Sequence, residues 1–360
     1  MSGVLSGDEV RVDLSSIEKS LAELWRGETR EGEPAVTRAA LWNVVAHTSS
    51  SEAHAQASRT LSTASASVPQ RTIVIRAEPD APDDMTSWIS ANCHLLGDRK
   101  QVCSEEVSIV AGGRRIHDVA PIVNALLIPD MPVAVWWLGD LPDDPELYGA
   151  TLLEPADRLI VDSSYFDSPA DLRLVSRIAH QTTTAPADLN WVRLEAWRVA
   201  TAALFDPPSV RALLPRIRTV RVVTNATGQA FGDYAESLLY AAWLSGQAGH
   251  RIHDDGKVEG AAGSIDYRMT SVTGSGDTGS LLEVSIEFDD GSAATVRSDD
   301  EHGALTTTVS GISQAMSSVT RALAGSEDEL IIRQLKRSDA DRVFMRVLPN
   351  AVKLAERLRT

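Results

Sequence analysis

Residues 132–140 read PVAVWWLGD, and this run decides the fold class of the chain. Apolar residues that continue without alternation are typical of a strand buried on both faces, as in parallel sheets covered by helices. The same pattern recurs at 71–77 (RTIVIRA) and 158–162 (RLIVD), and a related run lies at 39–48 (AALWNVVAHT). Helical segments are expected between these runs. We therefore expect an α/β N-terminal half with a mainly parallel sheet.

The C-terminal half has a different period. Apolar and polar residues alternate in four runs joined by turns rich in Gly and Asp: Ser264–Val272, Leu281–Phe288, Ala293–Ser298 and Ala304–Ser310. Alternation is typical of strands with one buried face, so we expect an α+β domain with an antiparallel sheet. Residues 329–336 are expected as a further strand and residues 339–358 as a closing amphipathic helix. The expected divisions are an N-terminal extension at 1–35, the α/β domain at 36–180 and the α+β domain at 181–360.

Three local signals predict where helices begin. Ser49 with Glu52, and Asp233 with Glu236, have the spacing of a capping box, in which each side chain satisfies a backbone N–H of the first turn. Pro121 suits the first position of an apolar helix, where its missing N–H costs nothing.

The charge of the chain limits its partners. Fifty acidic residues stand against 34 basic ones among 360, which gives a formal net charge of −16. Such a surface repels phosphate backbones and anionic lipid, so we expect binding neither to nucleic acid nor to a membrane. The acidity serves solubility alone, as in many bacterial-type proteins, or it suits a partner with a basic patch.

Targeting signals and cysteine content indicate a cytoplasmic protein. Met1–Val10 lacks the basic and apolar regions of a signal peptide, and no apolar run reaches the length of a membrane span. Cys93 and Cys103 are the two cysteines, too few to stabilise a chain of this size by disulfides. The pair is either two inert thiols or a redox-active pair whose pKa values are lowered by Arg99 and Lys100.

Motifs for catalysis or cofactors are weak. Gly274, Gly276 and Gly279 spell GxGxxG, but a strand-like segment follows them instead of a helix, so a hairpin loop explains them better than a nucleotide site. Four residues with zinc-ligand side chains lack the spacing of a zinc knuckle: Cys93, His94, Cys103 and His117. We therefore expect no catalytic residues, no cofactor and no metal.

Tryptophan and arginine are the residue types that suggest binding. Trp136 and Trp137 point to opposite faces of one strand, so one enters the core and the other requires a covering layer or a partner. They lie just before Asp140, at the end of the strand where open α/β sheets place their binding crevices. Arg193 and Trp197 are four apart on an expected helix, where they can stack.

Arg198 follows directly, and Trp and Arg are enriched at interface hot spots. The candidates for partner binding are therefore Trp136, Trp137, Asp140, Arg193, Trp197 and Arg198. For the tryptophans, burial in an inter-domain core is the alternative.

Four stretches resemble the OpcA family of glucose-6-phosphate dehydrogenase assembly proteins: LLIPDMPVAVWWLGD (126–140), ADRLIVDSSYF (156–166), DLNWVRLEAWR (188–198) and LFDPP (204–208). The stretches CSEEVSIVAGG (103–113) and LYAAWL (239–244) are consistent with this family. The resemblance extends over about residues 35–350, in the family's order and spacing.

This resemblance implies a two-domain protein without a reaction of its own. It would bind glucose-6-phosphate dehydrogenase and promote its assembly or allosteric activation, which supports NADPH supply by the oxidative pentose-phosphate pathway. In photosynthetic relatives the family is tied to redox control, which makes Cys93 and Cys103 a candidate redox pair. Two alternatives stay open: a sugar-phosphate-binding enzyme or metabolite sensor that uses the crevice near Trp137, and a scaffold for another partner.

Overall fold

Two compact units make up the protein. The computed structural model describes residues 4–6, 9–27, 35–96, 100–139, 141, 150–226, 230–273, 278–299, 301–312, 315–321 and 325–357. Contacts between residues group Met1–Val161, Thr183–Ala187 and Ser326–Ala340 into unit 1, and Asp162–Thr182, Asp188–Gly325 and Asp341–Thr360 into unit 2. The chain thus returns to unit 1 twice. The expected domain boundary at residue 180 stays a prediction, because this division interleaves the chain and does not cut it once.

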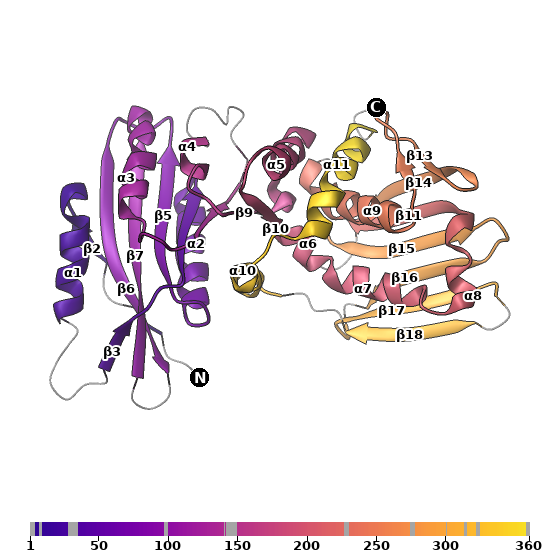
Figure 1. The fold of residues 1–360 in the computed structure, drawn as a ribbon, viewed down its shortest axis with the longest axis horizontal. Coiled ribbons are helices and arrows are strands. Elements are labelled where there is room, and N and C mark those ends of the chain that lie inside the picture. The colour runs from indigo at the N-terminus through magenta and orange to yellow at the C-terminus, as the bar shows by residue number, and fades with distance from the viewer. Residues whose placement is uncertain are drawn as a thin grey trace. The chain divides into compact units, whose positions relative to one another are not determined.

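Unit 1 is built on a mainly parallel sheet, as the unbroken apolar runs predict (Figure 1). Its strands are β1 (Val4–Ser6), β2 (Val10–Val12), β3 (Ala35–Arg38), β4 (Trp42–Thr48), β5 (Gln70–Glu78), β6 (Met85–Leu96), β7 (Lys100–Gly112), β8 (Val133–Trp137), β9 (Arg158–Val161) and β10 (Ala185–Asp188). The pairs β4–β5, β5–β7, β4–β8 and β8–β9 are parallel. All residues of β8 and β9 are buried, so both faces of these strands are covered.

The strand order of unit 1 is that of a doubly wound sheet. From β7 the order runs β7-β5-β4-β8-β9-β10, with β6 beyond β7. The chain therefore starts in the middle at β4, builds outward through β5, and then returns to the other side of β4 with β8. The position between β4 and β8 is the topological switch point, where sheets of this kind bind ligands at the carboxyl ends of their strands.

The first 35 residues take part in this sheet where they are described. β1 and β2 both pair antiparallel with β6, which itself pairs antiparallel with β7. Helix α1 (Ile17–Gly27) follows a short turn, and its Ile17 and Leu21 are buried. The described part of the expected N-terminal extension is thus integrated into the edge of the sheet.

The helices of unit 1 differ from the predictions in two places. Besides α1, they are α2 (Ser51–Ser65), α3 (Val119–Leu126), α4 (Ala150–Leu153) and α10 (Glu327–Lys336). Residues 329–336 were predicted as a strand, and this prediction is wrong: Leu330, Ile331, Gln334 and Leu335 are buried at helical spacing. The Glu327 carboxylate accepts hydrogen bonds from Gln56 Nε2 (2.8 Å) and Thr60 Oγ1 (3.0 Å) of α2. Helix α3 begins at Val119, two residues before the predicted Pro121.

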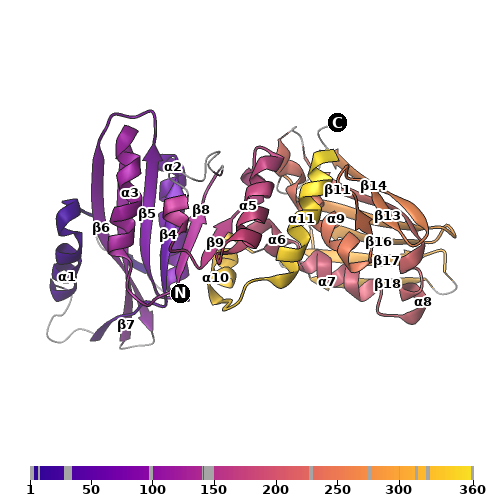
Figure 2. The same ribbon diagram turned by 45° about the horizontal axis from the view of Figure 1, so that its top comes forward.

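Unit 2 contains the second sheet, mostly antiparallel as predicted (Figure 2). Its strands are β11 (Ile217–Asn225), β12 (Arg251–Ile252), β13 (Val258–Gly260), β14 (Gly263–Val272), β15 (Leu281–Phe288), β16 (Ala293–Asp299), β17 (Ala304–Ser310) and β18 (Met316–Arg321). Their spatial order is β12-β13-β14-β11-β15-β16-β17-β18, and β11–β14 is the parallel pair. β14 and β15 lie on either side of β11, so the glycine-containing loop between them is not the predicted hairpin.

Helices cover one face of this sheet. They are α5 (Pro169–Gln181), α6 (Leu189–Arg193), α7 (Glu195–Leu204), α8 (Pro208–Arg211), α9 (Ala235–Gln247) and α11 (Arg342–Arg357). Helix α7 contacts β16, β17 and β18, and α9 contacts β11. Helix α9 is buried almost all round because α11 also packs on it. No helix within the described ranges is long and apolar enough to cross a bilayer.

Candidate functional site

The two tryptophans of β8 lie at the switch point of unit 1. Trp136 is 1% exposed and Trp137 is 3% exposed. The Trp137 ring stacks on the imidazole of His47, the partner residue on β4, with 3.9 Å between ring centroids and 19° between ring planes. Burial lowers the pKa of His47 to about 3, so the imidazole is neutral at physiological pH. Asp140, the third candidate of this run, lies outside the described residues.

The turn after β4 lacks the features of a dinucleotide site. A Rossmann site needs glycines here, so that the backbone can approach the pyrophosphate. Residues 42–65 contain none, and the sequence from His47 reads HTSSSE. Ser50 is the N-cap of α2, and its hydroxyl accepts a hydrogen bond from Ala53 N (3.1 Å). The capping box was predicted one residue earlier, at Ser49. A ring stack and a serine-rich turn thus lie at the carboxyl ends of β8 and β4.

Arg193, from α6, lies in a buried polar cluster of unit 2. Its guanidinium makes a bidentate ion pair with Asp162, Nη1 to Oδ1 at 2.9 Å and Nη2 to Oδ2 at 2.7 Å. Nη1 also donates to Asn190 Oδ1 (2.7 Å), and Asn190 Nδ2 donates to Ser163 Oγ (3.1 Å). The stretches 156–166 and 188–198, which were singled out as separate motifs, therefore meet in one hydrogen-bond network.

Two further carboxyl groups enlarge this cluster. Asp188 caps α6 through Oδ1, which accepts from Asn190 N (2.9 Å) and from Ser163 N (3.1 Å). Its Oδ2 is buried without a hydrogen-bond partner among the described residues. Glu236 of α9 is 6% exposed, and its Oε2 accepts from Leu281 N (3.2 Å). Glu236 therefore points into the protein and does not form the predicted capping box with Asp233.

Burial sets the protonation of these carboxyl groups. It raises the pKa of Asp188 to about 7, and the nearby negative charge of Asp162 adds to the rise. Burial also raises the pKa of Glu236 to about 8, although the positive charge of Arg193 opposes it. Burial acts to lower the pKa of Arg193, but the hydrogen bond and charge of Asp162 outweigh it. The guanidinium of Arg193 thus faces three carboxyl groups, those of Asp162, Asp188 and Glu236. Protons held by Asp188 and Glu236 reduce the excess of negative charge.

Arginine and tryptophan do stack in this region, but as a different pair. Arg193 and Trp197 were predicted to stack, whereas Arg193 binds Asp162 and Trp197 is 7% exposed on α7. Arg198 instead lies over Trp191, with its Cζ 3.5 Å from the ring centroid, and donates from Nη2 to Trp191 O (3.1 Å). Trp191 Nε1 donates to Asp341 Oδ2 (3.0 Å).

Sequence reasoning missed most members of the cluster. Asp162, Asp188 and Asn190 were not singled out, although all three lie inside the quoted motifs, and Glu236 was singled out only as part of a capping box. Polar residues beside apolar runs were a usable signal, because a carboxylate directly after a buried strand requires a partner.

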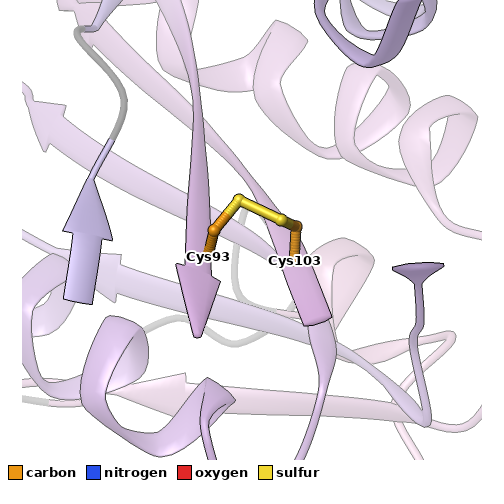
Figure 3. Close-up of a disulfide and its surroundings, with 2 residues drawn as sticks. All are labelled: Cys93 and Cys103. Atoms are coloured by element: carbon orange, nitrogen blue, oxygen red, sulfur yellow. A yellow bond between two sulfur atoms is a disulfide. The ribbon is translucent and has the colours of Figure 1, made fainter. Parts of the chain in front are cut away.

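A disulfide joins Cys93 and Cys103 (Figure 3). The two residues are direct partners on antiparallel strands β6 and β7, with a Cα–Cα separation of 4.0 Å. They are 5% and 0% exposed and pack with Ala91. The bond leaves neither sulfur available as a thiolate ligand. Among the described residues no group of three His, Cys, Asp or Glu side chains suits a metal ion.

Two protein-family models match the chain in succession. The model described as glucose-6-phosphate dehydrogenase subunit N-terminal domain matches residues 61–177, and the model of the C-terminal domain of the same subunit matches residues 184–348. Among individual proteins, one from Synechocystis, provisionally named OxPP cycle protein OpcA, is 30% identical over 188 residues. A protein of the same name from Synechococcus elongatus is 31% identical over 176 residues.

These relatives are much longer than the match. The aligned regions cover 51% and 48% of this chain, but 38% and 37% of the two relatives. Among solved structures, an NAD-binding oxidoreductase from Klebsiella pneumoniae aligns over 89% of this chain and 98% of its own, with a TM-score of 0.45 and 12% identity. A UDP-N-acetylglucosamine 3-dehydrogenase from Acidithiobacillus ferrooxidans gives a TM-score of 0.42 at 10% identity, over 88% and 97% of the two chains. Similarity at this level supports no conclusion about activity.

Proposed function

Because this chain belongs to the OpcA family of glucose-6-phosphate dehydrogenase assembly proteins, we propose that it binds that dehydrogenase and promotes its assembly or its active state. The observation that carries the proposal is the succession of the two subunit-domain models over residues 61–177 and 184–348. A location in the cytoplasm, and the absence of nucleic-acid binding, stay predictions.

Two features of unit 1 support a partner without a reaction of its own. The switch point is occupied by the stacked rings of His47 and Trp137, and the turn that follows β4 contains no glycine. A nicotinamide cofactor would require a close approach of the backbone to its pyrophosphate, which glycines in this turn would permit. Buried titratable groups of unit 2, such as Asp188 and Glu236, lie beneath the surface in a network of their own. They are therefore poorly placed to reach a substrate.

Activation by a bound protein has a thermodynamic requirement. The chain can shift the dehydrogenase toward its active state only by binding that state more tightly than the inactive one. A tenfold shift requires a difference in binding free energy of about 1.4 kcal/mol. We therefore expect the complex to be tighter when the dehydrogenase is held active by its own substrate.

The decisive experiment measures dehydrogenase activity against glucose 6-phosphate concentration, with and without this chain, using the enzyme of the same source. A lower Michaelis constant or a higher turnover, together with co-elution on a sizing column, is the expected result. If neither kinetics nor elution changes under reducing and oxidising conditions, the chain lacks this function despite its family.

The proposed binding residues can be tested separately. Arg198 is half-buried against Trp191, and Trp197 keeps 7% of its surface exposed. Arg198→Ala is expected to weaken the complex if this helix contacts the dehydrogenase. Arg177→Ala on α5 is the matched control, because Arg177 is exposed in the same unit. Equal binding by both variants would remove Arg198 from the interface. Trp197→Ala serves as the stability check, since unfolding of this variant would assign Trp197 to the core.

Redox control is a further prediction that rests on Cys93 and Cys103. Reduction of the disulfide opens the loop between these two cysteines, whose sequence separation is 10. Closing a loop of this length contributes about 2–3 kcal/mol in the chain-entropy account. Reductant should therefore lower the free energy of unfolding of the native chain and leave Cys93→Ala/Cys103→Ala unaffected. A regulatory pair should in addition make activation of the dehydrogenase depend on reductant, whereas a structural disulfide should not.

Metabolite binding near Trp137 stays the alternative prediction. The stack with His47 covers one face of the Trp137 ring. A thermal-shift screen with sugar phosphates tests it, because a ligand at about 100 times its dissociation constant stabilises the folded state by about 2.7 kcal/mol. No rise in melting temperature would count against a metabolite site.

A further inference from the structure

The sheet of unit 2 has one open face. Along β15, Val284, Ile286 and Phe288 are buried against the helices, whereas the alternate residues are partly or fully exposed. The cross-strand register continues this division from β14 to β18. We call the side opposite the helices the open face. One row of it reads, from β14 to β18, Thr270, Val223, Glu283, Arg297, Thr306 and Val319.

Exposed apolar residues and a hollow mark this face. Val272 on β14 is 46% exposed and Val319 on β18 is 68% exposed, and both belong to the open face by register. Between them lies a shallow hollow of about 830 Å³, whose lining includes Arg221, Glu283, Thr295, Arg297 and Thr306.

Charge is balanced on the open face, in contrast to the whole chain. The described strands β11 and β14–β18 place four arginines there, Arg221, Arg268, Arg297 and Arg321. They also place four carboxylates there, Asp266, Glu283, Glu287 and Asp299. The net charge of these residues is therefore zero, whereas the chain carries −16. Two copies of so acidic a chain repel each other over most of their surface. The open face adds little to this repulsion, because the charges of its strand residues cancel.

Several charges of the open face are already paired within the described part of the chain, and three are not: Arg221, Glu287 and Arg321, the last on the outermost strand β18. Arg297 binds Glu283 and Arg268 binds Asp266, each with contacts of 2.5 Å. Arg221 and Glu287 are exposed and have no hydrogen-bond or ion-pair partner in the described part of the chain. On the ladder, Arg221 is opposite Ser285, and Glu287 follows two residues later on the same strand. The two side chains thus have opposite charge and lie on a diagonal of neighbouring strands.

We propose that the open face is the interface with a second copy of this chain, in which Arg221 of each copy pairs with Glu287 of the other. A two-fold axis between the two side chains makes both ion pairs at once, as an isologous interface requires. Six strands about 4.8 Å apart and roughly seven residues long span about 550 Å². Over two copies this is about 1,100 Å², which exceeds the roughly 1,000 Å² expected of a specific interface. Side chains as long as Arg and Glu can also reach into the hollow.

The test is the molecular mass of the full chain in solution, without the dehydrogenase. Sedimentation velocity up to about 100 µM should show a dimer. Arg221→Glu and Glu287→Arg should each raise the dimer dissociation constant at least about tenfold, because like charges then face each other across the axis. The double variant Arg221→Glu/Glu287→Arg should restore the native value to within about threefold. Arg177→Glu, a reversal on the exposed side of α5, is the matched control and should leave the dimer unchanged.

Three results would overturn the proposal. One is a native chain that stays monomeric over this range. Another is a dimer that survives both single reversals, which would place the interface elsewhere. The third is a monomer whose complex with the dehydrogenase is lost in Arg221→Glu, because the open face would then belong to that enzyme. Circular dichroism of each variant shows whether a change in association comes from misfolding instead. Because the substituted side chains are exposed, the fold should persist.

Discussion

Each unit of the protein pairs an arginine with a buried carboxylate, but the two units balance the charge differently. In unit 1, Arg71 of β5 binds Glu105 of β7 at 2.7 Å, with both side chains at most 4% exposed, and its second carboxylate, Glu18, is 55% exposed. In unit 2, Arg193 binds Asp162, and the additional carboxyl groups of Asp188 and Glu236 are buried.

This difference decides which cluster must hold protons. In unit 1 the surplus negative charge belongs to Glu18, which water solvates at little cost. In unit 2 the surplus belongs to groups that water does not reach, so they keep protons instead of charge. A buried arginine alone therefore does not make a protein sensitive to pH. The sensitivity arises where buried carboxyl groups outnumber their cation.

The largest effect is expected from Arg71→Ala. The variant leaves Glu105 buried without its cation and also removes the donor to Leu126 O (2.5 Å). Breaking a fully buried ion pair from one side costs about 3–5 kcal/mol, because an uncompensated charge stays inside. Denaturant titration should show this loss. The double variant Arg71→Met/Glu105→Leu should recover most of it, and a failure to recover would mean that packing around Arg71 matters more than charge.

Arg193→Ala is expected to cost somewhat less, about 3 kcal/mol, because its side chain is 30% exposed. Asp162 then loses both of its ion-pair contacts while two further carboxyl groups stay nearby. The measurement is the free energy of unfolding at pH 6 and at pH 8. The loss should be smaller at pH 6, where more of the remaining carboxyl groups are protonated. An equal loss at both values would contradict the view that Arg193 compensates charge.

Glu236→Gln should change the pH dependence of stability. The pKa of Glu236 is raised to about 8 and that of Asp188 to about 7, both by burial first. The folded state therefore binds protons that the unfolded state has released, so stability falls as pH rises from about 4 to about 8. Removing Glu236 should reduce this slope by up to about 1.4 kcal/mol per pH unit.

The control for this prediction is Asp206→Asn, an exposed carboxyl group of the same unit, which should leave the slope unchanged. Glu106 of unit 1 also has a pKa raised to about 7, again mainly by burial. The comparison is therefore between variants of one chain at several pH values, and not between the two units. A slope that is identical in the native chain and in Glu236→Gln would show that Glu236 is charged in both states.

Much of the fold could be predicted from the period of apolar residues. Strands covered on both faces appear as unbroken runs such as VAVWW, and strands covered on one face alternate, as in LLEVSIEF. These patterns reflect burial directly. The pattern at residues 329–336 misled, because a short helix with two adjacent apolar residues per turn resembles a strand. β6 was missed because its sequence, MTSWISANCHLL, mixes polar and apolar residues without a clear period.

The candidate site was less predictable, because its members meet only through the fold. Asp162 and Arg193 are 31 residues apart and join two motifs that the sequence presents separately. Trp136 and Trp137 could be expected to lie at the end of a strand, but the covering ring of His47 comes from a strand 90 residues earlier. The partner of the Trp137 side chain thus depends on strand order, which residue spacing does not encode. The interface roles of these residues stay predictions.

The smallest effect is expected from Glu18→Gln, and it tests the comparison most directly. Glu18 contacts Arg71 at 2.6 Å, a shorter distance than the 2.7 Å between Arg71 and the buried Glu105. If distance decided the contribution, the two carboxylates would be equally important. Because Glu18 is 55% exposed, water screens the pair, and its loss should cost about 0–1 kcal/mol. Denaturant titration beside Glu105→Gln measures both. A loss above about 3 kcal/mol would mean that Arg71 needs both charges, and that exposure does not distinguish the two clusters.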